Sequence, residues 1–230
     1  MKIYEFSLKV YLLNNVRQEN ALEKIAQMID KALISTENYQ NFHNKNAFKF
    51  YNFNSLFPLE KGGVYKEGRI YSTIIRTVDG GLAKYFSNTL ANIYTADMKA
   101  LMLGNKMLKQ GHIHKLYSIT PTIIKSDEGY WRNCMSLEDY ERRIAINIIK
   151  KYNLFFNTKI DEDFELFNRI EFANSKPIAT SYKNIKLLGD KLNIYVADNE
   201  TAQKLACFAL GSGLGENNAR GYGFINYKLL

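Results

Sequence analysis

The sequence has few cysteines, and none of them is placed to bind a metal or to form a redox motif. Cys134 and Cys207 are the only two in 230 residues, and neither belongs to a C-x-x-C motif or has a ligand-like residue nearby. Isolated thiols of this kind are typical of a reducing cytosol. We therefore expect two ordinary half-buried thiols, no metal site, no cofactor and a cytoplasmic location.

Long hydrophobic runs are also missing. The first fifteen residues, MKIYEFSLKVYLLNN, alternate in polarity and are interrupted by Lys2, Glu5 and Lys9. This pattern excludes a signal peptide or membrane span there, so we expect no membrane partner. Hydrophobic residues nevertheless make up 46 % of the chain, enough for a buried core.

The charge is unbalanced, since the formal net charge is +8 and the pI is about 9.2. The chain also contains 16 tyrosines and 14 phenylalanines. Basic charge together with many aromatic rings is typical of nucleic-acid binding. Many basic proteins bind no anionic partner, so composition alone leaves both possibilities open.

Hydrophobic periodicity predicts the order strand, helix, two strands, helix, strand, twice along the chain. In the first half we expect strands at 2–13, 47–53 and 98–110, a strand or a hairpin at 64–78, and helices from Leu22 (capped by Asn14 or Asn15) and at 81–93. In the second half we expect strands at 115–124, two within 179–197 around a turn at Gly189 and Asp190, and one at 221–230. The helices of that half are capped by Ser136 and by Asp198 or Asn199. On the first of them, Arg142, Arg143, Lys150 and Lys151 should lie on the exposed face.

This order indicates an α+β fold of two tandem ferredoxin-like (RRM-like, βαββαβ) domains. The N-terminal domain would span residues 1–114, and the C-terminal domain residues 115–230. Such a sheet leaves one face open, where unstacked RNA bases can lie on aromatic rings.

Near the carboxyl end, residues 211–224 read GSGLGENNARGYGF and contain five glycines. Gly211 is explained as the cap of the preceding helix. The remaining glycines do not form a dinucleotide-binding loop, because a helix precedes them and a strand follows, and the chain lacks a G-K-[ST] motif. In a strand, Gly221 and Gly223 would share a face of bare backbone that another backbone can approach. With Arg220 at its edge, this loop looks suited to a phosphate chain.

The segment GLGENNARGYG resembles the glycine-rich signature of the RAMP superfamily. Its C-terminal position is similar to that in the CRISPR repeat-cleaving endoribonucleases, which also resemble this chain in size, basic charge and two ferredoxin-like domains. The resemblance implies binding of CRISPR repeat RNA within precursor crRNA. The residues expected to contact it are Lys45, Gly213, Gly215, Arg220, Gly221 and Gly223. It leaves open other CRISPR effector subunits, or a second copy in a homodimer, as protein partners.

Only three histidines exist, and His43 lies in the polar segment NYQNFHNKNAFKFYNF. The resembling nucleases place a catalytic histidine in this region and a lysine six residues later, which His43 and Lys49 match. Histidine suits proton transfer near neutral pH, and lysine suits charge stabilisation at the phosphate. The implied activity is metal-independent cleavage by attack of the 2′-OH, giving 2′,3′-cyclic phosphate and 5′-OH ends. A solvated loop histidine is the alternative.

One feature departs from the family pattern. Several members carry a catalytic tyrosine on the first helix, but residues 18–36 contain none, so Tyr39 is the nearest substitute. A packing role for Tyr39 is equally open.

Three further features of the sequence each allow more than one interpretation. His112 and His114 would share a strand face, without further ligands, as an interdomain surface pair. The acidic residues 161–163 would be an exposed turn or, less plausibly, the site of a metal-dependent nuclease. Finally, RAMP relatives include non-catalytic RNA-binding subunits of CRISPR ribonucleoproteins, which have no need of a histidine in the N-terminal turn.

Overall fold

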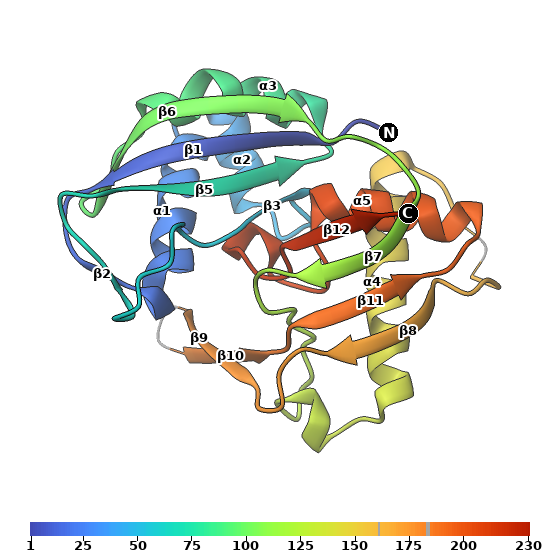
Figure 1. Ribbon diagram of the computed structural model, residues 1–230. Coiled ribbons are helices and arrows are strands. Elements are labelled where there is room, and N and C mark those ends of the chain that lie inside the picture. Colours follow the sequence, from blue (N-terminus) through green and yellow to red (C-terminus); the bar gives the residue numbers. More distant parts are fainter. Residues whose placement is uncertain (161, 183–184) are drawn as a thin grey trace.

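The structure is a computed structural model that describes residues 1–160, 162–182 and 185–230. It contains two four-stranded antiparallel sheets with the helices on one side of them (Figure 1). Each sheet is built from a βαββαβ unit, so the predicted α+β class and the tandem ferredoxin-like architecture are confirmed.

The N-terminal sheet has the strand order β3-β5-β1-β6. Its strands are β1 (Tyr4–Leu12), β3 (Tyr51–Phe53), β5 (Ile70–Thr77) and β6 (Met98–Met107), and its two helices are α1 (Ala21–Leu33) and α3 (Gly80–Thr89). A small ladder pairs β2 (Val16–Arg17) with β4 (Val64–Tyr65). The apolar residues of α1, including Ile25, Ile29 and Leu33, lie in a core with those of β1 and β5.

The C-terminal sheet has the equivalent order β12-β7-β11-β8. Its strands are β7 (Ile113–Ser118), β8 (Phe167–Phe172), β11 (Leu192–Val196) and β12 (Ile225–Leu229), and its helices are α4 (Leu137–Phe156) and α5 (Glu200–Ser212). The predicted caps hold for these helices: Ser136 Oγ accepts from Asp139 N at 3.0 Å, and Asn199 Oδ1 accepts from Ala202 N at 2.8 Å. The chain passes between the two sheets after Met107 and before Ile113.

Several local predictions were wrong. Asn14 and Asn15 do not cap α1, because their side chains bond to Ala96 and Glu67, and the 3₁₀ turn η1 (Gln18–Asn20) precedes the helix. The polar turn expected after α1 contains a second helix, α2 (Glu37–Asn44).

The two strands predicted within 179–197 are not a sheet pair. The structure has β9 (Ile178–Tyr182) and β10 (Ile185–Gly189) as a separate hairpin, while β11 pairs with the unpredicted β8. The hairpin extends toward the start of α1 (Figure 1). Lys183 and Asn184, also in the predicted segment, lie outside the described residues.

The two domains share an extensive contact. Helix α5 packs against β3 and β5. The approach is so close that a Cβ on Gly211 would lie 2.6 Å from Cγ1 of Val78, the residue that follows β5. Arg76 of β5 forms a buried ion pair with Glu5, at 2.7 Å, and also donates to the carbonyl of Ile225, at 2.6 Å. A buried guanidinium with both partners in place fixes the N-terminal sheet against β12.

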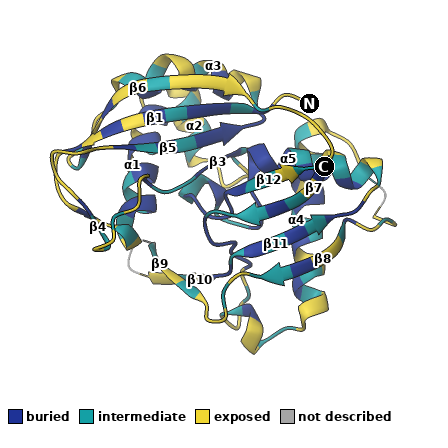
Figure 2. Cartoon of the chain, viewed as in Figure 1, coloured by how far each residue is buried: buried dark blue, intermediate teal, exposed yellow. Residues whose placement is uncertain are grey.

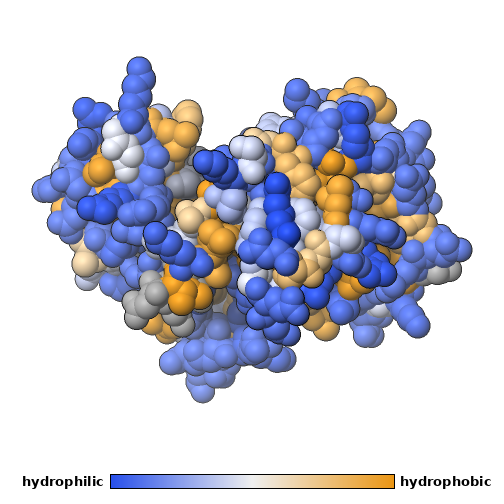
Figure 3. Space-filling model, turned by 90° about the horizontal axis from the view of Figure 1, so that it is seen from below, coloured by the Kyte–Doolittle hydropathy of each residue, from blue (hydrophilic) through white to orange (hydrophobic). Residues whose placement is uncertain are grey.

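Burial follows this arrangement. Buried positions concentrate on the central strands and the inner faces of the helices, whereas β6, α3 and the connecting loops are largely exposed (Figure 2). One face of the molecule is mostly hydrophilic, with hydrophobic patches between the polar side chains (Figure 3). None of the described helices combines the length and apolar character needed to cross a bilayer.

Candidate active site

A groove of about 840 Å³ lies where the two domains meet. Most of its lining comes from three segments: residues 43–50 at and after the end of α2, residues 216–220 of the glycine-rich loop, and one side of α4. Lys125 and Ser212 also contribute. Four residues predicted for the site, His43, Lys45, Lys49 and Arg220, are brought together there. They come from opposite ends of the sequence, so their meeting depends on the docking of the two domains.

His43 occupies the last turn of α2 and is half-buried. Its Nδ1 lies 3.3 Å from Oδ1 of Asp30, which is on α1. The other oxygen of Asp30, Oδ2, accepts a hydrogen bond from Arg220 of the loop. One carboxylate thus connects the candidate histidine to the glycine-rich loop. Asp30 was not predicted, because it belongs to no motif and only flanks the apolar stripe of α1.

Lys49 turns back toward the end of α2. Its Nζ donates to the carbonyls of Lys45 at 2.6 Å and His43 at 3.1 Å, and to that of Phe42. Burial, followed by the nearby Arg220, lowers the pKa of the Lys49 ammonium, while Asp30 opposes the shift. An ammonium at a helix carboxyl end is favourable, and here it fixes the last turn of α2, which carries His43.

Further cations surround these residues. Lys45, Lys125 and Lys150 are exposed along the groove. Among the described lining residues Glu216 carries the opposing charge, and its carboxylate lies 3.8 Å from Lys125 Nζ. The groove is therefore basic, as a site for a polyanion requires.

The four loop glycines are buried and do not line the groove. Each has a positive φ: +83° at Gly213, +64° at Gly215, +86° at Gly221 and +67° at Gly223. The predicted bare strand face is wrong, because residues 221–223 form a turn and β12 begins at Ile225.

The space beside these glycines is filled by the protein itself. A Cβ on Gly223 would lie 1.8 Å from the carbonyl oxygen of Leu214, and one on Gly221 would lie 2.6 Å from the Phe53 ring. Gly213, rather than the predicted Gly211, is the residue that ends α5. The glycines therefore allow a tight fold of the loop, whose residues 216–220 line the groove.

Lys151 of α4 stabilises this loop from the protein interior. Contrary to prediction it is buried, and its Nζ donates to the carbonyls of Gly213 at 3.0 Å and Gly215 at 2.6 Å, and to Asn218 Oδ1 at 2.6 Å. Burial lowers the pKa of the Lys151 ammonium to about 7, with Glu216 opposing. The signal was present in the sequence, since position 151 continues the apolar stripe of Ile144 and Ile148 at helical spacing.

Tyr39 is not in the groove. Its ring stacks on Tyr85 of α3 with centroids 3.8 Å apart and meets Phe42 edge-on at 6.1 Å. Burial, then Asp79, raises the pKa of its hydroxyl. Tyr39 thus lies one turn before His43 on α2, but its ring packs on α3 and it does not line the groove.

The other candidates lie elsewhere. His112 Nε2 is 3.2 Å from the exposed carboxylate of Asp198, and His114 meets the ring of Tyr195 on the open sheet face. Within the described residues, no three His, Cys, Asp or Glu side chains converge as a metal site would require. Asp161, the first of the three acids considered for a metal site, is outside the described residues.

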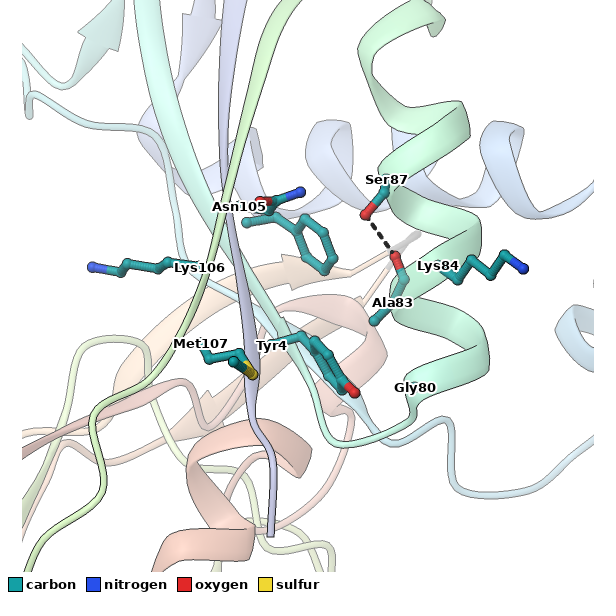
Figure 4. Close-up of a pocket in the computed structure, with 9 residues that line it drawn as sticks. Tyr4, Gly80, Ala83, Lys84, Ser87, Asn105, Lys106 and Met107 are labelled. Atoms are coloured by element: carbon teal, nitrogen blue, oxygen red, sulfur yellow. Dashed lines mark hydrogen bonds between the residues drawn. The ribbon is translucent and has the colours of Figure 1, made fainter.

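A second pocket, of about 430 Å³, lies between α3 and the strands β1 and β6 (Figure 4). Ser87 Oγ donates to the carbonyl of Ala83 inside it, at 3.0 Å, while Lys84 and Lys106 point away in opposite directions. Its lining contains no histidine or carboxylate, so the groove remains the better candidate.

Two tandem ferredoxin-like domains with a glycine-rich loop before the last strand define a protein of the RAMP type. The chain belongs to the Cas6 family: the family model described as CRISPR associated protein Cas6, C-terminal, matches residues 107–227. It is similar to CRISPR-associated endoribonuclease Cas6 1 of Methanocaldococcus jannaschii, at 26 % identity over 214 residues that cover 81 % of this chain and 76 % of the relative. A second protein of that organism, CRISPR-associated endoribonuclease Cas6 2, is 22 % identical, with coverage of 85 % and 87 %.

Solved structures share the fold across its full length. A RAMP protein described as binding different RNA substrates has a TM-score of 0.76 at 15 % identity, covering 98 % of this chain and 99 % of that one. The product of a Cas6-related gene from Pyrococcus furiosus has a TM-score of 0.71 at 15 % identity, covering 98 % of each chain.

Proposed function

We propose that this protein is a metal-independent endoribonuclease that binds CRISPR repeat RNA and cleaves precursor CRISPR RNA. The observation that carries the proposal is the position of His43, at the edge of a basic groove formed by both domains. The relatives named endoribonucleases support the activity, and a similar fold with a TM-score of 0.67 is described as a Cas6 product complex.

The chemistry uses the nucleophile that RNA itself carries. His43 takes the proton of the 2′-OH, and the 2′-oxygen attacks the adjacent phosphorus. The bond to the 5′-oxygen then breaks, and that oxygen takes a proton from a water molecule as it leaves. The products are a 2′,3′-cyclic phosphate and a 5′-OH. Lys45, Lys150 and Arg220 hold the phosphates on either side, and Lys49 adds positive charge near the cut phosphate.

The glycine-rich loop contributes by shape. Its glycines fold the segment so that residues 216–220 form one wall of the groove. We propose that RNA contacts this wall through Arg220 and its neighbours, and that the glycines act indirectly.

Cleavage of a repeat-containing RNA in excess EDTA tests the proposal. Cutting should continue in EDTA, and a single 2′-deoxy nucleotide at the cut should stop it, because the attacking oxygen is gone. If EDTA stops the reaction and the deoxy substrate is still cut, a metal-dependent nuclease replaces our proposal.

A non-catalytic RNA-binding subunit of a CRISPR ribonucleoprotein is the second candidate. It is favoured by the absence of Tyr39 from the groove and by the engagement of Lys49 with three backbone carbonyls. Tight binding of repeat RNA without cleavage of any of several repeats would support this function.

A further inference from the structure

Asp30 of α1 contacts both α2 and the glycine-rich loop. Its Oδ2 accepts from Arg220 Nη1, and its Oδ1 lies 3.3 Å from His43 Nδ1. The side chain is about a quarter exposed, at 23 %. Arg220 therefore holds one carboxylate oxygen so that the other faces the imidazole.

The Asp30 oxygen that faces His43, Oδ1, needs a hydrogen-bond donor. Oδ1 is enclosed and accepts no well-formed hydrogen bond from any described residue in the structure. A buried carboxylate oxygen without a donor is costly, and a donor from a neighbouring ring removes that cost. His43 Nδ1, 3.3 Å from Oδ1, is the neighbouring ring nitrogen able to donate to it.

The proton position on His43 follows from this contact. A neutral imidazole carries one N–H, and the hydrogen bond made by one nitrogen decides which nitrogen keeps the proton. With Nδ1–H directed at Asp30, Nε2 keeps its lone pair, which is the state a general base requires.

We propose that Asp30 is a positioning residue that sets the Nδ1–H tautomer and the ring orientation of His43. The proposal rests on the proposed function, in which His43 takes the 2′-OH proton. In addition, Asp30 stabilises the imidazolium once His43 has taken that proton. An aspartate that orients a catalytic histidine in this way raises turnover by several orders of magnitude in serine proteases.

The tautomer is measurable without RNA. In protein with ¹⁵N-labelled histidine, at a pH where the rings are neutral, long-range ¹H–¹⁵N correlation spectra separate protonated from unprotonated ring nitrogens. With three histidines in the chain, His43→Gln identifies its signals. We expect Nδ1–H for His43 in the parent and a loss of that preference in Asp30→Asn. An Nε2–H tautomer in the parent, or an unchanged tautomer in the variant, would overturn the proposal.

Asp198→Asn is the matched control. Asp198 lies 3.2 Å from His112 Nε2, but its side chain is 87 % exposed, so water competes for the contact. The change should leave the His43 signals where they are. Thermal unfolding of Asp30→Asn and its circular dichroism verify that the variant is folded, and Asp30→Glu should restore the tautomer preference in part.

Kinetics form the second readout. Asp30→Asn should lower the single-turnover cleavage rate by about 10²-fold or more while the Kd for repeat RNA changes by less than about threefold. A changed tautomer with an unchanged rate would overturn the catalytic part of the proposal. If the parent itself cuts no repeat RNA, the proposed function fails, and the spectra alone still decide whether Asp30 sets the tautomer.

Discussion

The two walls of the groove hold their shape in different ways. The glycine-rich loop is held by contacts with the protein interior. Its glycines pack against protein atoms, and the buried Lys151 donates hydrogen bonds to three of its oxygens. The opposite wall, residues 43–50, is half-buried or exposed, and Lys49 and the His43–Asp30 contact tie it in place. One wall is thus a rigid support, whereas the other carries the groups able to perform chemistry.

Replacing His43 should have the largest effect on activity. His43→Ala should lower single-turnover cleavage by about 10²- to 10⁴-fold, because a positioned proton-transfer group contributes that much, while RNA affinity changes little because phosphate contacts dominate binding. His114→Ala, on the open face of β7, is the matched control and should cut at the parental rate. Undiminished cutting by the His43 variant would place the active site elsewhere.

Replacing Gly223 tests the rigid wall. Gly223→Ala should lower the free energy of unfolding by about 2–5 kcal/mol, since the new Cβ would lie 1.8 Å from Leu214 O and the backbone must move. Gly63 has nearly the same φ, +69° against +67°, and open space beside it. Gly63→Ala should therefore cost only the strain of a left-handed residue, about 1–2 kcal/mol. Equal losses in denaturant unfolding would show that packing beside Gly223 is unimportant.

Lys151→Met should lower the free energy of unfolding and remove part of its dependence on pH. The parent's Lys151 has a pKa of about 7 when folded against 10.5 in the unfolded chain, so between these values the unfolded chain binds more protons. Its contribution to the free energy of unfolding therefore rises with pH, by up to about 1.4 kcal/mol per pH unit, and is flat below about pH 7. The variant should lose this slope and about 1–3 kcal/mol through unpaired loop oxygens. Parallel denaturation profiles from pH 6 to 9 would rule out this titration.

The sequence predicted the elements that have strong periodicity. Helices α1, α4 and α5 and strand β1 were predicted from their apolar periodicity. Strand β8 was missed, and the hairpin β9–β10 with β11 was interpreted as two sheet strands, because short strands beside turn residues have no clear period. His43, Lys45, Lys49 and Arg220 were found from motif spacing. The burial of Lys151 could have been predicted from the apolar stripe of α4, but its partners in the loop, like the contacts of Asp30, depend on distant segments that no local pattern encodes.

Removing the Tyr39 hydroxyl should have the smallest effect on cleavage. Two substitutions at this position separate a packing role from a catalytic one. Tyr39→Phe keeps the ring that stacks on Tyr85 and removes only a hydroxyl that lies outside the groove, so cleavage should stay within about threefold of the parent. Tyr39→Ala removes the stack, loosens α2 against α3 and should slow cleavage more, through displacement of His43. Both variants are assayed by single-turnover cleavage across pH. If the Phe variant lost as much activity as the Ala variant, the hydroxyl itself would take part in the reaction, and α2 would have to rearrange when RNA binds.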